Sequence, residues 1–316
     1  MADAGGFTEA VRQELARQPL PQDPSARSEL RALAQLAGTV TFRGGSRPED
    51  RIRLEVRTSS GAVARRAFAL LAQCYEQRAE LVVHAPGGMR RRSTYAVRLD
   101  AGAHDVGIDL GLLDDAGHPV DPTIGELALG PATAYLRGAL LACGSLSSPG
   151  REPHLEITVR SGELARELAS LTGRVLGSSV SATAGERPRV VVKSGATIGE
   201  LLTAVGATGA FLAWDERRLR RQLRGDATRL ANADTANVRR AVEAAAAQVA
   251  AVEAAVAHHG WEALDDDLRA VALARLANPA ATLTELGQLL DPPLAKSAVH
   301  RRMKRLERLG QGPEAS

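Results

Sequence analysis

Residues 155–162 run Leu155-Glu156-Ile157-Thr158-Val159-Arg160-Ser161-Gly162, and the repeat architecture of the chain is recognised most easily from this segment. Apolar and polar residues alternate along it with a period of two, which is typical of a half-buried strand, and a helical pattern follows from Gly162. The same order stands earlier in the chain, where Leu54-Glu55-Val56 and Ser60-Gly61 both precede their counterparts by 101 residues (155 − 54 and 161 − 60). This recurrence predicts two copies of one structural unit.

Each copy is predicted to contain a helix that ends at a glycine, then a hairpin, a second helix and a second hairpin. Between the copies, residues 101–131 are rich in Gly, Asp and Pro and are expected to form a loop-rich bridge. Strands are expected at 40–42, 52–57, 81–84, 95–99, 155–160 and 189–193, and the glycines that end the first helices are Gly38 and Gly144. These patterns predict an α+β body with pseudo-two-fold symmetry over residues 1–211, with tandem repeats at about 28–100 and 131–205.

Residues 212–260 are predicted to form one long linker helix. Six small apolar residues follow one another there at alternating spacings of four and three, as in the seam of a coiled coil: Val238, Val242, Ala245, Val249, Val252 and Val256. Such a seam packs either within the chain or against a second copy, and the pattern leaves both open. His258-His259 at the end of the helix is interpreted as a solvated helix terminus rather than a metal site.

The last segment, residues 261–316, is predicted to be an all-α helix-turn-helix domain. Asp265-Asp266-Asp267 opens its first helix, where the helix dipole favours negative charge. Thr282-Leu283-Thr284-Glu285 has the form of a capping box, which predicts the start of the second helix. Asp291-Pro292-Pro293 ends that helix, and a final helix is expected from about Ala295 to Leu309. Helix, short turn and helix in this order are typical of DNA-binding domains.

The final helix carries six cations and one anion between positions 296 and 308. Such a stripe gains affinity for duplex DNA by releasing counterions, and Arg side chains bond base edges in the major groove. We therefore predict a DNA-contacting set of Thr282, Lys296, Ser297, His300, Arg301 and Lys304, and a phosphate-holding set of Arg302, Arg305 and Arg308. The alternative is a solvated basic helix that packs only on its own domain.

A second group of arginines lies at the start of the long helix, at Arg217, Arg218, Arg220, Arg221 and Arg224. These positions cover more than one helix face, so the group either contacts phosphates or is simply solvated. Arg90-Arg91-Arg92, on a predicted hairpin turn, is likewise either a remnant of phosphate contacts or a charged loop.

The composition is that of an ordinary soluble globular protein of 316 residues, with a formal net charge of +3 and 3% aromatic residues. The low aromatic content disfavours stacking platforms for single-stranded nucleic acid. Cys74 and Cys143 form no CxxC pair, which favours a reduced cytoplasmic protein without disulfides. We expect neither a signal peptide nor a membrane span, because no apolar run has the required length.

Several stretches resemble the WhiA family. Ser297-Ala298-Val299-His300-Arg301-Arg302, after Leu289-Leu290-Asp291-Pro292-Pro293-Leu294, resembles the family's C-terminal motif, and Asn232-Ala233-Asp234-Thr235-Ala236-Asn237 resembles its entry to the long helix. The segments Leu33–Gly38 and Leu136–Gly144 resemble eroded LAGLIDADG helices. The resemblance implies two degenerate homing-endonuclease-like repeats whose motif helices pack along the pseudo-two-fold axis. The chain departs from common family forms at Ala295, where Ser or Thr often caps the helix, and at His300, which replaces a frequent Asn.

In active LAGLIDADG endonucleases, an acidic residue precedes the final glycine of each motif helix and holds a divalent metal. Here Ala37 and Cys143 occupy those two positions, and neither offers the hard oxygen that Mg²⁺ demands. We therefore expect no nuclease activity, no catalytic residues, no bound metal and no cofactor. Cys143 is interpreted as a small buried thiol at a helix contact rather than as a nucleophile.

The resemblance implies a site-specific DNA-binding transcriptional regulator of sporulation, cell division and chromosome segregation genes, located in the cytoplasm with the nucleoid. Its expected partners are double-stranded DNA, a WhiB-like iron–sulfur regulator and RNA polymerase. Two alternatives are a protein-interaction scaffold that docks on RNA polymerase or a partner, and an active LAGLIDADG endonuclease.

Overall fold

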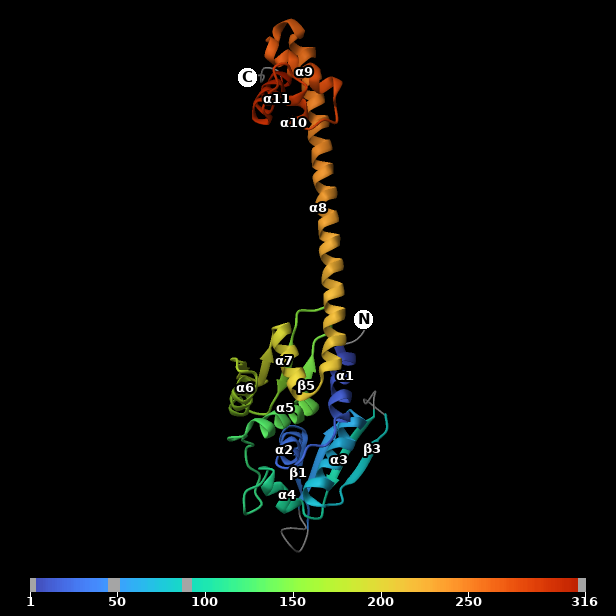
Figure 1. The fold of residues 1–316 in the computed structure, drawn as a ribbon, viewed down its shortest axis with the longest axis vertical. Coiled ribbons are helices and arrows are strands. Elements are labelled where there is room, and N and C mark those ends of the chain that lie inside the picture. The colour runs from blue at the N-terminus through green and yellow to red at the C-terminus, as the bar shows by residue number, and fades with distance from the viewer. Residues whose placement is uncertain (1–3, 45–51, 87–92, 312–316) are drawn as a thin grey trace. The chain divides into compact units, whose positions relative to one another are not determined.

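The computed structural model describes residues 4–44, 52–86 and 93–311 (Figure 1). The chain divides into two compact units, Met1–Gln222 and Leu223–Ser316, and each is described by itself. In the part of the chain that is described, no helix has the length and apolarity needed to cross a membrane.

Helix α1 (Ala4–Arg17) precedes the first repeat, which begins with α2 (Ser25–Ala37). As expected from the sequence, α2 ends at Gly38. The elements that follow are β1 (Gly38–Phe42), β2 (Ile52–Thr58), α3 (Gly61–Tyr75), β3 (Glu80–His84) and β4 (Thr94–Leu99). The strands form one antiparallel sheet in the order β1-β2-β4-β3, in which Val56 pairs with both Gly38 and Val97.

The second repeat has the same element order and the same sheet topology. It consists of α5 (Leu129–Cys143), β5 (Gly144–Leu146), β6 (Leu155–Thr158), α6 (Gly162–Leu176), β7 (Ser181–Thr183) and β8 (Arg189–Val192). Its sheet order β5-β6-β8-β7 corresponds strand by strand to that of the first repeat. The predicted architecture, two tandem α+β repeats of one topology followed by a long helix and an all-α domain, is confirmed.

Beyond α1, two helices of the first unit lie where none was predicted from the sequence. The bridge between the repeats contains α4 (Ala103–Asp109), and the second repeat is followed by α7 (Gly195–Val205). Buried Ile198, Leu201 and Leu202 of α7 belong to the large core shared by both repeats.

The two motif helices, α2 and α5, pack against each other at close range. A Cβ atom on Gly138 of α5 would lie 2.8 Å from the Ala32 Cβ of α2, so only glycine fits there. The buried Tyr135 hydroxyl donates to Gln35 Oε1 at 2.7 Å across the same contact. Glu29, also on α2, is fully buried and pairs with the buried Arg66 of α3. The close approach at Gly138 and the Tyr135–Gln35 hydrogen bond hold the two repeats together, whereas the Glu29–Arg66 pair ties α2 to α3 within the first repeat.

The second unit is all-helical. Helix α8 (Thr208–His259) begins in the first unit, where Trp214 is fully buried, and continues into the second. The short η2 (Trp261–Ala263) leads to α9 (Asp266–Ala277), α10 (Leu283–Gln288) and α11 (Lys296–Gly310). Their core is made by Val252, Ala255, Leu264, Leu268, Val271, Ala272, Leu286, Leu290, Val299, Met303 and Leu306.

The valine seam of α8 divides into two parts. Val252 is fully buried in the core of the second unit, whereas Val238 and Val242 are 64% and 63% exposed. The end of the seam therefore packs within the chain, and α8 contributes its last turns to the compact unit that the sequence analysis began at residue 261.

Candidate nucleic-acid interface

Local hydrogen bonds fix the starts of α9 and α10. Asp265 caps α9, where its Oδ1 accepts from the Leu268 N–H at 2.8 Å. The predicted capping box at α10 is present, because the Thr282 hydroxyl accepts from the Glu285 N–H at 3.3 Å and Glu285 Oε2 accepts from the Thr282 N–H at 2.7 Å. This bond from the Thr282 backbone lowers the pKa of the Glu285 carboxyl. Thr282 is thus occupied as a helix cap.

The turn between α10 and α11 closes tightly on α10. The Leu294 N–H donates to the Gly287 carbonyl at 2.8 Å, and a Cβ on Gly287 would overlap the Leu294 carbonyl oxygen. Ala295 then serves as the N-cap of α11 without a side-chain hydrogen bond, as its methyl side chain requires. The turn sets the direction in which α11 leaves.

Helix α11 buries one face and exposes another. Val299, Met303 and Leu306 are buried, while Lys296, Ser297, His300, Arg301 and Lys304 are exposed. Among the residues with described positions, no ion pair involves Lys296, His300, Arg301 or Arg308; Lys304 pairs with Glu307 at 2.6 Å. The exposed flank therefore presents positive charge that no acidic residue within 4–44, 52–86 and 93–311 neutralises, apart from Glu307 at Lys304.

The three arginines predicted to hold phosphates differ in whether they already have a carboxylate partner. Arg302 bonds Asp267 at 2.5 Å and Arg305 bonds Asp265 at 2.8 Å, so two of the three predicted arginines hold carboxylates at the start of α9. Together with Arg301 and Arg308, these groups line a hollow of about 380 Å³. The acidic run 265–267, predicted from the sequence only to favour the helix dipole of α9, thus also holds α11.

The second arginine group is largely engaged within the protein. Arg218 pairs with Asp215 at 2.7 Å, Arg220 pairs with Glu216 at 2.7 Å, and the Arg217 guanidinium lies 5.0 Å from the centre of the Phe7 ring. Arg221 packs over Gly150, and Arg224 is exposed. Fewer cations of this group are therefore left without a partner than on the exposed flank of α11.

Ala37 and Cys143, the residues before the glycines that end the two motif helices, offer no hard oxygen ligand for a metal. Ala37 ends α2, and the Cys143 thiol at the end of α5 donates to the Leu36 carbonyl at 3.6 Å, with its pKa raised by burial. Within the described ranges, no three His, Cys, Asp or Glu side chains gather as metal ligands would. Arg90, Arg91 and Arg92 lie outside the described residues.

In both repeat sheets, an acidic residue on the second strand pairs with arginines of the same sheet. Glu55 on β2 accepts from Arg98 at 2.5 Å and also pairs with Arg57. Its counterpart Glu156 on β6 lies 3.5 Å from Arg189. The two acids occupy equivalent places in the repeats, so the described sheet surfaces are less cationic than α11.

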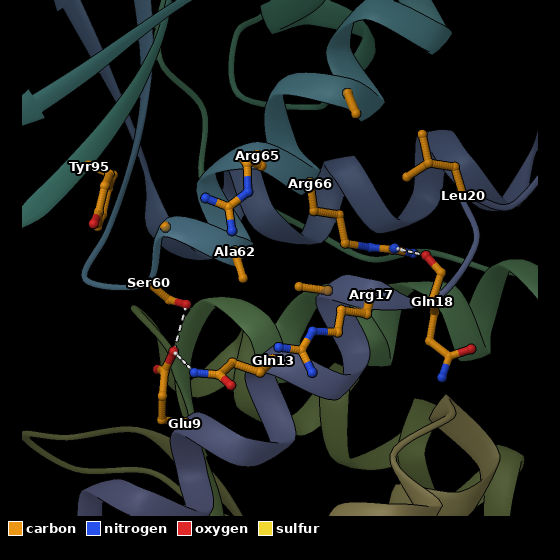
Figure 2. A pocket seen from close by; sticks show the side chains of 13 residues that line it. Glu9, Gln13, Arg17, Gln18, Leu20, Ser60, Ala62, Arg65, Arg66 and Tyr95 are labelled. Carbon is orange, nitrogen blue, oxygen red and sulfur yellow. Dashed lines mark hydrogen bonds between the residues drawn. The ribbon is translucent and has the colours of Figure 1, made fainter.

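A polar pocket of about 530 Å³ opens between α1 and the start of α3 (Figure 2). Glu9 accepts from the Ser60 hydroxyl at 2.9 Å and from Gln13 at 3.4 Å, while Arg66 donates to the Gln18 carbonyl. Arg17 and Arg65 also line it. No sequence pattern pointed to this pocket, and Glu9 is the one acid among the described residues that line it, so it lacks a pair of acids suited to a divalent metal.

Three family models match the chain in succession. The WhiA N-terminal LAGLIDADG-like domain matches residues 25–113, the WhiA LAGLIDADG-like domain matches 132–224, and the WhiA C-terminal HTH domain matches 227–310. Two relatives described as probable cell division protein WhiA, from Acidothermus cellulolyticus and Streptomyces coelicolor, are each 40% identical to this chain. The alignments cover 95% of this chain, and 92% and 90% of those relatives.

The fold is also similar to that of full-length DUF199/WhiA from Thermatoga maritima, solved by crystallography, with a TM-score of 0.56 and 23% sequence identity. That likeness covers 96% of this chain and 98% of the other and concerns the fold alone. The resemblance inferred from the sequence is thereby confirmed. With two LAGLIDADG-like repeats, a C-terminal helix-turn-helix and relatives 40% identical over nearly its whole length, the chain belongs to the WhiA family.

Proposed function

We propose that this chain is a site-specific DNA-binding transcriptional regulator that places α11 in the major groove of duplex DNA. The observation that carries the proposal is the exposed flank of α11, where Lys296, His300 and Arg301 have no carboxylate partner among the described residues. A duplex neutralises such charge with phosphates and offers base edges to Arg and His. Ser297, Lys304 and Arg308 extend the same surface, and Arg302 and Arg305 reach phosphates only by leaving their aspartates.

The genes proposed as targets follow from the family. The relatives are described as probable cell division proteins, which supports targets in cell division. The resemblance extends the proposal to sporulation and chromosome segregation, to a WhiB-like iron–sulfur regulator and RNA polymerase as protein partners, and to a cytoplasmic, nucleoid-associated location.

The repeat body is proposed to have no nuclease activity and to serve as an interaction platform. Ala37 and Cys143 supply no ligand for Mg²⁺, and the sheet arginines Arg98 and Arg189 are already paired with Glu55 and Glu156, as Arg53 is with Asp100. Incubation of the full chain with duplex DNA and Mg²⁺ is expected to leave the DNA intact. Metal-dependent cutting that is abolished by replacing a nearby carboxylate would refute this part of the proposal.

The domain limits proposed from the sequence, 1–211, 212–260 and 261–316, need one extension. Because Val252 and Ala255 are buried in its core, the DNA-binding unit includes the last turns of α8. Experiments on this unit should therefore retain α8.

The proposal is tested by genome-wide occupancy with matched variants of the full chain. Arg301→Ala/Lys304→Ala removes one unpaired and one intrahelically paired cation from α11. Arg240→Ala/Arg239→Ala makes the same change on α8, where Arg239 pairs with Glu243 at 2.7 Å and Arg240 has no carboxylate partner in the described chain.

The α11 variant is expected to lose its site-specific peaks and the α8 variant to keep them, because both variants lose two charges but only one set faces the duplex. Unchanged promoter binding by the α11 variant would reject the proposal in favour of a protein-interaction scaffold.

A further inference from the structure

An apolar groove lies within the second unit, between α8 and the segment that leads into α10. It has a volume of about 810 Å³. Val238 and Val242 line it from α8, and Pro279 and Leu283 line it from the other side. Small-molecule sites commonly have volumes of roughly 300–1,000 Å³ and mostly apolar walls with a few polar groups. The groove has the size and the character of a ligand site.

The charges in the groove walls are all positive. Arg275 and Lys296 line it, and none of the other lining residues is acidic. Arg275 is 1% exposed and donates to neutral oxygens, those of Ala281 at 2.7 Å, Pro279 at 3.2 Å and the Gln248 side chain at 2.8 Å. Its Nε–H is buried without an acceptor in the described part of the chain.

The other buried charged residues that the structure describes each have a partner of opposite charge, unlike Arg275. Glu29 and Arg66 pair with each other, and Glu55 pairs with Arg98. Arg275 has no carboxylate partner among the residues whose positions are described, and burial lowers its pKa. A buried cation without a counter-charge favours an anion nearby, and the exposed Lys296 is the lining cation that such an anion can reach directly. The groove therefore favours an occupant that is apolar and negatively charged.

We propose that this groove binds a small amphiphilic carboxylate, and that the bound molecule weakens the grip of α11 on DNA. The apolar part of the ligand packs on Val238, Val242 and Leu283, and its carboxylate lies at the Lys296 end. Lys296 is the first residue of α11 and Thr282 caps α10, so the ligand touches the starts of both helices of the helix-turn-helix. Binding stands on the groove alone, whereas the effect on DNA rests on the proposed function.

The test uses the full chain with 8-anilinonaphthalene-1-sulfonate, an apolar anion whose fluorescence rises in apolar sites. Saturable binding is expected, with displacement by decanoate below its micellar concentration. Decanol, which has the same chain without the charge, is expected to compete about tenfold less well. Ala245→Phe fills the groove and is expected to abolish dye binding, while Ala250→Phe, exposed on α8 outside the groove, leaves it unchanged.

Circular dichroism melting shows whether both variants fold, and light scattering shows whether the chain self-associates. Equal competition by decanol, or dye binding to folded Ala245→Phe at the wild-type level, overturns the proposal. Loss of dye binding as the protein becomes dimeric also overturns it, because a second copy would then be the occupant.

The effect on DNA is measured separately, by anisotropy of a labelled duplex. Decanoate is expected to lower the affinity of the wild type several-fold and that of Ala245→Phe not at all. An unchanged wild-type affinity overturns the regulatory half of the proposal. Absence of any duplex binding without decanoate would instead be a failure of the proposed function, while the dye titration still decides the groove.

Discussion

Gly287 carries a specific steric demand at the scale of a single residue. It lies in α10 against the turn to α11, where a methyl group would overlap the Leu294 carbonyl oxygen. Gly287→Ala is expected to destabilise the second unit by about 1–3 kcal/mol, because one backbone segment must move away from another. Hydrogen exchange of the α11 amides in increasing denaturant measures this loss.

Gly225 provides the matched control. It lies in α8, and the atom nearest to a Cβ there would be the end of the flexible Arg229 side chain at 3.5 Å. Gly225→Ala is expected to stabilise its helix by about 0.5–1 kcal/mol, since glycine is a poor helix former. Protection of α11 that is the same in Gly287→Ala and wild type would contradict the steric account.

Ala295 leaves the first turn of α11 without a side-chain cap. Its backbone is extended (φ −66°, ψ 150°), which is the conformation in which a Ser hydroxyl accepts from the following N–H groups. Ala295→Ser is expected to raise the free energy of unfolding of the second unit by about 1 kcal/mol, and Ala295→Val, which has no acceptor, to give no gain. Urea denaturation of the three chains measures the difference. A valine variant as stable as the serine variant would rule out capping as the cause.

The two cysteines are expected to react slowly in the folded chain. Burial raises the pKa of Cys74 to about 11 and also raises that of Cys143. A raised thiol pKa means less thiolate at a given pH, so alkylation by iodoacetamide at about pH 8 should be far slower than in denaturant and should accelerate as pH rises. Mass spectrometry over time gives both rates. Equal rates in folded and unfolded chain would show that the thiols are not protected.

At the scale of elements, period-two and helical patterns predicted most strands and helices of the repeats, because each has one buried face. The short strands β5 and β7 have three residues each and give too little pattern to detect. Helix α4 was hidden by the Gly and Asp residues around it, and α7 by the assumption that each copy ends with its last strand.

The contact between α9 and α11 also escaped the sequence analysis, because it joins residues 35 to 40 positions apart. Helical periodicity places Arg302 and Arg305 on one side of α11, but no pattern shows that Asp267 and Asp265 stand opposite. The exposed face of α11 was easier to predict, since its cations alternate with a buried stripe of Val299 and Met303.

Asp267 is expected to restrain DNA binding. It holds Arg302 at 2.5 Å and adds negative charge beside the cationic flank. Asp267→Asn frees the guanidinium and removes that charge, so duplex affinity at low salt should rise several-fold and the gain should shrink at high salt. Asp115→Asn, an exposed loop change of equal charge in the first unit, serves as control. An unaltered or reduced affinity in Asp267→Asn would contradict this expectation and indicate that the ion pair between Arg302 and Asp267 itself supports DNA binding.

At the scale of the whole molecule, the chain consists of a LAGLIDADG-like body and a charged helical unit. In the body, the offset of 101 residues places Glu55 and Glu156 at equivalent positions, and both neutralise arginines on their sheets. In the second unit, the α11 flank remains unneutralised within the described chain. Charge distribution, rather than the net charge of +3, therefore distinguishes the two units.

The most direct test of the account is the salt dependence of duplex binding by the full chain, measured by fluorescence anisotropy. The logarithm of the affinity should fall linearly with the logarithm of salt concentration. Lys296→Gln and Arg308→Gln should each reduce the slope by about 0.9, because each removes one cation that neutralises a phosphate. Arg240→Gln on α8 should keep the wild-type slope. An affinity that is indifferent to salt, or three variants with the same slope as wild type, would contradict the claim that α11 faces the duplex.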